Sequence, residues 1–191
     1  RRLLKLIGGS AVAVFAGALL AVGLIRVTAP APPELLRSVE VVDRNGLLLR
    51  PFSLPDGRWR LSAKPGQVDK RYLEMLVAYE DRRFEDHFGV DPLALIRATY
   101  QLVTNGEIVS GGSTLSMQVA RLIEPRKHRT MVAKFAEIVR AMQLEARLSK
   151  QEILELYLTL APFGGNLEGV RAASHAYFGK EPLRLTTGEA A

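Results

Sequence analysis

Cysteine is absent from the 191 residues of this chain, and so is the Asp-x-Asp pair. Without cysteine, the chain cannot form disulfide bonds or use a thiolate nucleophile. That absence is compatible with an exported protein but does not establish export. Enzymes that act on nucleotide sugars often hold a metal ion and the nucleotide with Asp-x-Asp, so its absence counts against that class of enzyme.

Two further motifs are missing, Ser-x-x-Lys and Lys-Thr-Gly. They are typical of enzymes whose active-site serine is acylated by β-lactams. We therefore expect no covalent β-lactam binding by these residues. The sequence also contains no internal repeat and no low-complexity tract, which counts against repeat architectures.

The charged residues are unbalanced toward the basic side. There are 26 lysines and arginines against 20 aspartates and glutamates, which gives a formal net charge of +6. A basic balance suits an anionic partner, whether nucleic acid, anionic lipid or pyrophosphate, and does not choose among them. The length allows one domain with a real core plus an appendage.

The stretch from Leu6 to Ile25 contains no charged residue and no proline. It is long enough to cross a bilayer as a helix. Basic residues precede it, namely Arg1, Arg2 and Lys5. We therefore predict that residues 1–27 are a cytoplasmic stub and a transmembrane helix, with the rest of the chain translocated. A cleaved signal peptide is the alternative, but prolines follow the candidate cleavage site near Ala29.

Residues 28–62 are predicted to form a linker and a short β pedestal. The tract from Thr28 to Pro33 is rich in proline and alanine and should be stiff and extended. Two β-type runs, Val39–Val42 and Leu47–Leu49, flank Asp43-Arg44-Asn45-Gly46, which predicts a hairpin. From residue 63 to 191 we expect one helical catalytic domain.

The segment from Glu80 to Gly89 is acidic at a predicted helix end. A helix running into Glu80 is indicated by apolar residues at helical spacing, namely Tyr72, Met75, Leu76 and Tyr79. A helix C-terminus prefers cations, yet Glu80 and Asp81 lie there. A local rule broken without structural gain points to function, here a carboxylate that accepts a proton. A solvated acidic loop is the structural alternative.

The segment Gly111-Gly112-Ser113-Thr114 precedes an apolar-periodic run, which predicts a loop that enters a helix N-terminus. Exposed backbone N–H groups there favour an anion. One helix face then carries a polar stripe, made of Thr114, Gln118 and Arg121. A hydroxyl, an amide and a guanidinium beside such a terminus suit a pyrophosphate. An N-cap followed by an ordinary solvated face is the alternative.

A very apolar helix is predicted from Pro92 to about Val103, with Asn105-Gly106 as its stop. The sequence favours a core helix here, and the alternative is a lobe that dips into the outer leaflet of a membrane. The basic cluster at residues 126–129 suits lipid head groups or nucleic acid, with a solvated turn as the alternative.

The helix predicted from Thr130 to Leu148 has three distinct sides. Its core side is predicted at Met131, Phe135, Ile138 and Met142. Its solvent side is predicted at Arg140, Gln143 and Arg147. Lys134 and Glu137 lie on a third side, in line with Ala141, Leu144 and Leu148. Glu137 is therefore expected to line a cleft, although an i, i+3 ion pair is the structural alternative.

Two capping boxes mark later helix starts, at Ser149–Glu152 and at Thr186–Glu189. Between them, a helix is predicted from Glu168 to Phe178, stopped by Gly179. Because the chain ends at Ala191, before the last helix could form, we expect the domain to be truncated at its C-terminus.

Together the first two motifs are far more specific than either alone. Glu-Asp-x-x-Phe-x-x-His-x-Gly from Glu80, followed by Gly-Gly-Ser-Thr-x-x-x-Gln from Gly111, resembles the peptidoglycan glycosyltransferase family. That family is the transglycosylase domain of class A penicillin-binding proteins and of monofunctional transglycosylases. The resemblance implies a mainly α, lysozyme-like, two-lobed helical domain, preceded by the transmembrane helix and the β pedestal.

Three later segments are similar to the remaining family motifs, namely Lys134-x-x-Glu137, Glu152–Leu158 and Tyr177–Lys180. The resemblance therefore covers roughly residues 60 to 191. The tract Tyr157–Val170 resembles the penicillin-binding protein 1C branch of the family.

The resemblance implies site residues position by position. Glu80 matches the catalytic general base, and Glu137 matches a second catalytic carboxylate that pairs with Lys134 near the leaving pyrophosphate. Positions that shape and support the base are matched by Asp81, Phe84 and His87. Donor-site positions are matched by Ser113, Thr114, Gln118 and Arg121. We expect Glu80 and Glu137 to face each other across a cleft.

The family reaction polymerises lipid II into glycan strands, with inversion at the anomeric carbon and release of undecaprenyl pyrophosphate. The implied partners are lipid II, the growing strand and the bilayer, but not nucleic acid, with a transpeptidase domain expected C-terminal to this one. The implied location is the inner membrane, crossed once, with the catalytic domain in the periplasm. A divalent cation, Mg²⁺ or Mn²⁺, at the pyrophosphate is left open, and no organic cofactor is expected.

Four positions depart from the common family pattern. Met117 stands where many relatives have a second glutamine, and Thr159 where asparagine is usual. Arg121 replaces a common lysine, which keeps the charge and changes its shape. Ala133 stands where many have arginine, which removes part of the expected pyrophosphate clamp.

Two other classes of function remain open from the residues. A helical domain with a catalytic glutamate also suits a lysozyme-like hydrolase or a lytic transglycosylase. A membrane-tethered scaffold or a basic nucleic-acid binder is the non-enzymatic alternative, and the predicted outward topology counts against DNA as a partner.

Overall fold

The computed structural model describes residues 17, 20–32, 34–105, 111–126, 128 and 130–191. The mainly helical class predicted from sequence is confirmed, and it is consistent with the expected lysozyme-like arrangement. The described residues include six helices of nine residues or more: α2 (Lys70–Glu80), α3 (Pro92–Asn105), α4 (Leu115–Ile123), α5 (Met131–Glu145), α6 (Lys150–Leu160) and α7 (Val170–Phe178).

Short elements connect and end these helices. They are the strands β1 (Glu40–Val42), β2 (Leu48–Pro51), β3 (Trp59–Arg60) and β4 (Leu167–Glu168), the 3₁₀ turns η1 (Pro65–Gln67), η2 (Phe84–Asp86) and η3 (Pro182–Arg184), and the one-turn helix α8 (Thr187–Ala190).

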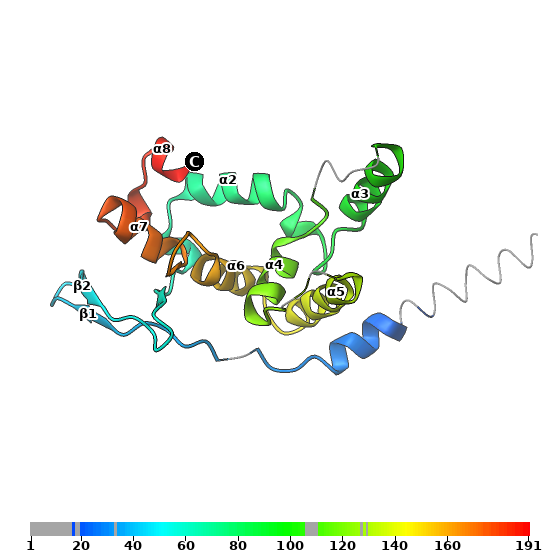
Figure 1. The fold of residues 1–191 in the computed structure, drawn as a ribbon, viewed down its shortest axis with the longest axis horizontal. Helices are drawn as coiled ribbons and strands as arrows, with labels where there is room; N and C mark the ends of the chain where they lie inside the picture. The colour runs from blue at the N-terminus through cyan, green and yellow to red at the C-terminus, as the bar shows by residue number, and fades with distance from the viewer. Residues whose placement is uncertain (1–16, 18–19, 33, 106–110, 127, 129) are drawn as a thin grey trace, which may run out of the picture.

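Helix α4 is the centre of the domain and lies between α5 and α6 (Figure 1). Its residues Leu115, Met117 and Val119 are fully buried, because apolar side chains occupy most of its circumference. The main core cluster around it contains Phe84, Leu115, Met117, Val119, Ala120, Ala141, Leu144, Ile153, Tyr157 and Ala161. The segments that carry both motifs are therefore attached to the most rigid part of the molecule.

The predicted β hairpin is confirmed. Strands β1 and β2 pair antiparallel, with Val41 opposite Arg50. The Asp43 carboxylate accepts hydrogen bonds from the backbone N–H groups of Asn45 and Leu47, each at 2.8 Å. Gly46 closes the turn with φ of 81°, a conformation that side chains disfavour.

The pedestal is joined to the helical domain at two places. Strand β3 pairs in parallel with β4, with Arg60 opposite Glu168. Arg171 of α7 forms an ion pair with Glu40 of β1 at 2.7 Å. The expected boundary at residue 62 is thus crossed by sheet pairing.

Residues 20–27 are helical, and the linker after them contacts the helical domain. The Arg147 guanidinium donates two hydrogen bonds to the carbonyl of Ala29, at 2.9 and 3.1 Å. The Arg26 guanidinium lies 4.3 Å from the centre of the Phe88 ring. Within the described part of the chain, no helix has the length and apolar character needed to span a membrane. Most of the predicted span, Leu6 to Ile25, lies outside the described residues and stays a prediction.

The predicted sides of helix α5 were partly wrong. Met131 and Phe135, expected in the core, are 85% and 66% exposed. Arg140, expected in solvent, is buried and forms an ion pair with Glu124 at 2.7 Å. The core side is instead the one that carries Ala141 and Leu144. Gly89 approaches the α5 backbone there so closely that a Cβ atom on it would lie 2.8 Å from the carbonyl carbon of Ala141.

Helix α3 is not the core helix that the sequence favoured. Its apolar side chains are mostly exposed, including Leu93, Ile96, Tyr100 and Val103. In Figure 1 it stands to one side of the body formed by α2, α4 and α6. Its start at Pro92 is as predicted, and the helix runs two residues past Val103.

Two later boundaries also differ from the prediction. Helix α7 begins at Val170 and not at Glu168, which belongs to β4. Gly169 separates them with φ of 86°, and a Cβ atom there would lie 2.6 Å from the carbonyl oxygen of Thr159. Both predicted capping boxes are confirmed, and the second one starts α8, a helix that we expected not to form.

Asp91 attaches helix α3 to the loop after α2, which generates a first prediction. Its carboxylate accepts hydrogen bonds from the N–H groups of Leu93 and Ala94, at 2.9 and 3.0 Å, and pairs with Arg83. Although burial opposes it, the hydrogen bond from Arg83 lowers the pKa of Asp91.

Asp91→Ala should lower the free energy of unfolding by about 1 to 2 kcal/mol, because the helix cap and the ion pair are both lost. Urea unfolding measures this, with Asp56→Ala, at an exposed turn, as the control. A carboxylate with a lowered pKa stabilises the fold above its unfolded pKa and stops doing so as the pH falls. The difference between wild type and variant should therefore shrink below about pH 4. An unchanged urea midpoint at pH 7 would contradict this account of the cap.

Candidate active site

Glu80 is the last residue of α2, as predicted, and its carboxylate is held by α4. The Gln118 side-chain amide donates a hydrogen bond to Glu80 Oε2 at 2.8 Å. Asp81, the next residue, leaves the helical conformation with φ of −158°. Glu80 is half-buried and is therefore accessible to a ligand while one of its oxygens is held in place.

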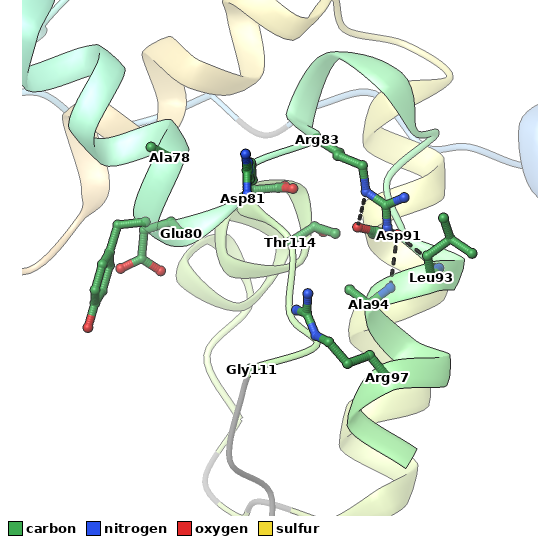
Figure 2. A pocket seen from close by; sticks show the side chains of 12 residues that line it. Ala78, Glu80, Asp81, Arg83, Asp91, Leu93, Ala94, Arg97, Gly111 and Thr114 are labelled. Carbon is green, nitrogen blue, oxygen red and sulfur yellow. Dashed lines mark hydrogen bonds and ion pairs between the residues drawn. The ribbon is translucent and has the colours of Figure 1, made fainter. Parts of the chain in front are cut away.

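Glu80 lines a cavity of about 620 Å³ together with Asp81, Thr114 and Arg97 (Figure 2). Figure 2 shows the Arg97 guanidinium directed into this space, and Arg83 beside Asp91 at its edge. The cavity thus places a carboxylate on one side and cationic groups on the other. Such a site suits a ligand with both a hydroxyl group and an anionic group.

Asp81, the residue after Glu80, is almost completely buried. Both of its carboxylate oxygens lie 3.0 Å from Nε2 of His87, and Oδ2 also accepts a hydrogen bond from the N–H of Leu115 at 2.9 Å. His87 Nδ1 has no hydrogen-bond partner among the described residues. The tautomer with hydrogen on Nε2 therefore satisfies Asp81.

Two of the N–H groups at the start of α4 are occupied by the protein itself. Asp81 takes that of Leu115, and the Thr114 hydroxyl accepts from that of Met117 at 3.2 Å. The Thr114 hydroxyl also donates to the carbonyl of Gly89 at 2.6 Å and is fully buried. Thr114 therefore serves as an N-cap, and these two groups are not the open anion site that the sequence predicted.

Phe84 is also a packing residue in this structure. Its ring is 1% exposed within the main core cluster, and its edge faces the His87 ring. The side chains of the three residues expected to shape and support the base, Asp81, Phe84 and His87, are therefore all buried.

A second cavity, of about 680 Å³, is lined by Arg121, Lys134 and Glu137. Lys134 Nζ donates to Ser113 Oγ at 2.6 Å and to Glu137 at 3.2 Å. The i, i+3 ion pair considered from sequence is therefore present, and it lies in a cavity wall as predicted for Glu137. Ser113 joins this group through Lys134.

The structure brings the predicted residues together in two sets. Glu80 lines the first cavity and accepts a hydrogen bond from Gln118, whereas Arg121, Lys134 and Glu137 line the second cavity. Glu80 is not among the residues that line the second cavity, and Glu137 is not among those that line the first. Gln118 and Arg121, one turn apart on α4, connect the two sets. That the two glutamates face each other across one cleft stays a prediction.

Several residues of both cavities were not identified as site residues from sequence. Arg126 and His128 of the basic cluster line the second cavity. Arg58, which directly precedes β3, and Glu168 of β4 line it as well. The excess of basic residues after α4 was the available signal. Nothing in the local sequence indicated that residue 58 would reach the same wall.

Tyr157 of α6 lies near both sets. Burial, and then the charge of Glu80, raise the pKa of its hydroxyl to about 12, while Arg121 acts in the opposite direction. Its hydroxyl group is therefore protonated at neutral pH. Tyr157 is also part of the main core cluster.

The comparison with protein families agrees with this geometry. Residues 46–191 match the family described as Transglycosylase. The chain belongs to this transglycosylase family. The resemblance inferred from the motifs is thereby confirmed.

Named relatives agree with the family. The chain is 51% identical to penicillin-binding protein 1C of Escherichia coli over 151 residues, which is 79% of this chain and 20% of that protein. It is 37% identical to penicillin-binding protein 1A of Vibrio cholerae, over 83% of this chain and 19% of that protein. The chain thus spans about a fifth of the length of these two relatives. It is also 36% identical to the biosynthetic peptidoglycan transglycosylase of Acinetobacter baylyi, over 70% of this chain and 63% of that protein.

The departures from the common pattern have structural explanations in this transglycosylase domain. Met117 is fully buried in the core, where a glutamine amide would need partners. The Thr159 hydroxyl is buried and accepts a hydrogen bond from the N–H of Ala63 at 3.3 Å. Ala133 lines the second cavity without a charge, so Arg121, Arg126 and Lys134 supply the positive charge there.

Asp81→Ala tests whether the buried carboxylate holds the domain together. The variant leaves His87 Nε2 and the N–H of Leu115 buried and unpaired, so unfolding should become easier by roughly 2 to 5 kcal/mol. Thermal and urea unfolding measure the change. Asp86→Ala, an exposed position in the same segment, should change stability by less than about 0.5 kcal/mol. Equal stabilities for the two variants would show that Asp81 is not a structural anchor.

Proposed function

We propose that this domain is a peptidoglycan glycosyltransferase that joins lipid II units into glycan strands in cell-wall synthesis. The family match and the named relatives support that activity. The observation that carries the mechanism is the position of Glu80. Glu80 lies at the wall of the first cavity and is held by Gln118. Gln118 is one helical turn from Arg121, which lines the second, cationic cavity.

In the proposed reaction Glu80 acts as the general base. Its carboxylate takes the proton from the 4-hydroxyl of the acceptor sugar, whose oxygen attacks the anomeric carbon of the donor strand. The bond to the pyrophosphate oxygen breaks, and undecaprenyl pyrophosphate leaves with its electron pair. Attack from the opposite side inverts the configuration from α to β. The hydrogen bond from Gln118 fixes the base for this transfer.

The second cavity is the proposed place for the departing pyrophosphate. Arg121 and Lys134 would stabilise the negative charge that develops on it. Glu137 keeps Lys134 oriented through their contact at 3.2 Å. Ser113 holds the same ammonium group from the other side, at 2.6 Å.

A divalent cation at the pyrophosphate fits the residues only in part. Within the described residues, no three His, Cys, Asp or Glu side chains are grouped to hold a metal ion. Mg²⁺ is commonly bound by one or two carboxylates together with substrate phosphates. Glu137 is the residue that would contribute such a carboxylate, and the ion would supply charge neutralisation for the leaving group.

The proposal extends to the membrane, since both substrates carry lipid chains. Exposed apolar side chains on α3 and at the start of α5 support contact with a bilayer, in particular Ile96, Val103, Met131, Val132 and Phe135. We further propose an inner-membrane location, with this domain in the periplasm and a transpeptidase domain elsewhere in the whole protein.

Glu80→Gln should lower the rate of lipid II polymerisation by about 100- to 10,000-fold, because the amide cannot accept the proton. Strand length and rate are measured by gel with labelled lipid II. Glu74→Gln, on the exposed face of the same helix, is the matched control and should retain the wild-type rate. Residual activity near wild type in Glu80→Gln would remove the base from the mechanism. Release of short fragments from sacculi, without polymerisation, would favour a hydrolase.

Membrane contact through α3 can be tested in the full chain with one fluorophore. In a Trp59→Phe background, which removes the only tryptophan, Ile96→Trp should be strongly quenched by brominated lipids in reconstituted vesicles. Leu49→Trp in the exposed hairpin is the matched control and should not be quenched, since it is equally exposed but lies on the pedestal. Equal quenching at the two positions would contradict an attachment through α3.

A further inference from the structure

A buried ion pair that the proposed reaction does not use lies beneath the catalytic segment. Glu145 of α5 and Lys150 of α6 are joined at 2.6 Å, and their side chains are 4% and 19% exposed. Neither residue belongs to the motifs that identified the site. Neither was singled out as a site residue by the sequence.

The Lys150 ammonium group has three partners on two different segments. It donates to the backbone carbonyl of His87 at 2.7 Å and to Glu145 Oε1 at 2.6 Å. It also lies 4.6 Å from the centre of the Phe84 ring. Two of these three contacts are therefore to the segment that follows Glu80, one at its middle and one near its end.

Glu145 links the same ammonium group to α4. Its Oε1 atom accepts a hydrogen bond from the Ser116 hydroxyl at 2.6 Å, and Ser116 is fully buried. Ser116 is two residues ahead of Gln118, the residue that holds Glu80. The pair thus joins the segment after the base and the helix that orients the base.

The position of Lys150 is unfavourable for stability alone. It is the first residue of α6, where the helix dipole disfavours a cation. Burying a charged pair also costs desolvation, and apolar side chains of similar volume often give equal or higher stability. Other contacts already hold residues 81–89, including the hydrogen bond that the N–H of Leu115 donates to the Asp81 carboxylate. Instead, the Lys150 ammonium group donates to the backbone carbonyl of His87 and thereby specifies the path of residues 81–89.

We propose that Glu145 and Lys150 are positioning residues for the base Glu80. They hold residues 84–87 against α4 so that the Glu80 carboxylate keeps its place beside Gln118. The inference rests on the proposed function, because it concerns the residue that takes the proton. Neither residue touches substrate in this assignment.

The test is the double variant Glu145→Gln/Lys150→Met in the full chain. It keeps the side-chain volumes and the acceptor for Ser116, and it removes both charges and the donor to His87. We expect an unchanged melting temperature, a kcat for lipid II polymerisation at least about tenfold lower, and a KM within about twofold of wild type. Loss of alignment lowers the rate of the chemical step and leaves binding intact.

A merely structural role is separated by repeating the change in a Glu80→Gln background. Two residues that act through Glu80 should lower the residual rate no further once that carboxylate is gone. A general loss of folded protein would lower the rate by the same factor in both backgrounds, and that result would overturn the proposal. The matched control is Glu74→Gln/Lys70→Met, an exposed ion pair at 3.4 Å, which should change neither kcat nor KM.

The outcomes distinguish this inference from the proposed function. A wild-type kcat in the double variant, together with an inactive Glu80→Gln protein, overturns the positioning role and leaves the base in place. A wild-type rate in Glu80→Gln overturns both.

If near-ultraviolet circular dichroism shows that the double variant does not fold, Lys150→Arg replaces it. This variant keeps the charge but changes the geometry of the contact with His87. A lower kcat with an unchanged KM supports the proposal, and an unchanged kcat overturns it.

Discussion

The Asp81 carboxylate is the interaction on which the arrangement of this domain depends. It accepts a hydrogen bond from the first N–H of α4 and contacts the buried His87 ring with both oxygens. A negative charge at a helix N-terminus is favourable, and here it also ties the end of α2 to the start of α4. Because Glu80 is adjacent to Asp81 in the chain, the same contact delivers the base to Gln118. The carboxylate that Asp81 places at the C-terminal end of α2 is thus balanced by the N-terminus of α4.

Helix α4 combines two properties that normally conflict. It is the most buried helix of the domain, yet its Gln118 side chain holds Glu80 at the first cavity and its Arg121 side chain lines the second. Helix α4 packs against both α5 and α6, and its N-terminal end meets the segment that follows Glu80. The catalytic groups are therefore supported by close packing, and their alignment does not depend on a mobile loop.

The proposed chemistry divides between the packed body, which carries Glu80, and an exposed apolar surface. Glu80, Gln118 and the second cavity lie on the packed body, whereas α3 and the start of α5 present apolar side chains to the surroundings. The proposed reaction draws both substrates from a bilayer, and such a surface near Glu80 would serve it. Asp91 connects the two parts, since it caps α3 and pairs with Arg83 in the segment that follows Glu80.

The sequence by itself determined the end of α2 at Glu80, the hairpin turn, both capping boxes and the family, because these depend on residues close together in the chain. It also predicted Glu80, Gln118 and Lys134 as site residues, and the structure places Gln118 against Glu80 and Lys134 against Ser113. Only the tertiary structure decided that Thr114 is a buried cap and that Asp81 fills the α4 terminus. Periodicity defines which residues share a helix side but not which side is covered, so Phe135 was placed in the core when it is exposed. That choice depends on the segments that pack against the helix, here on the loop residue Gly89, which closely approaches the backbone of Ala141.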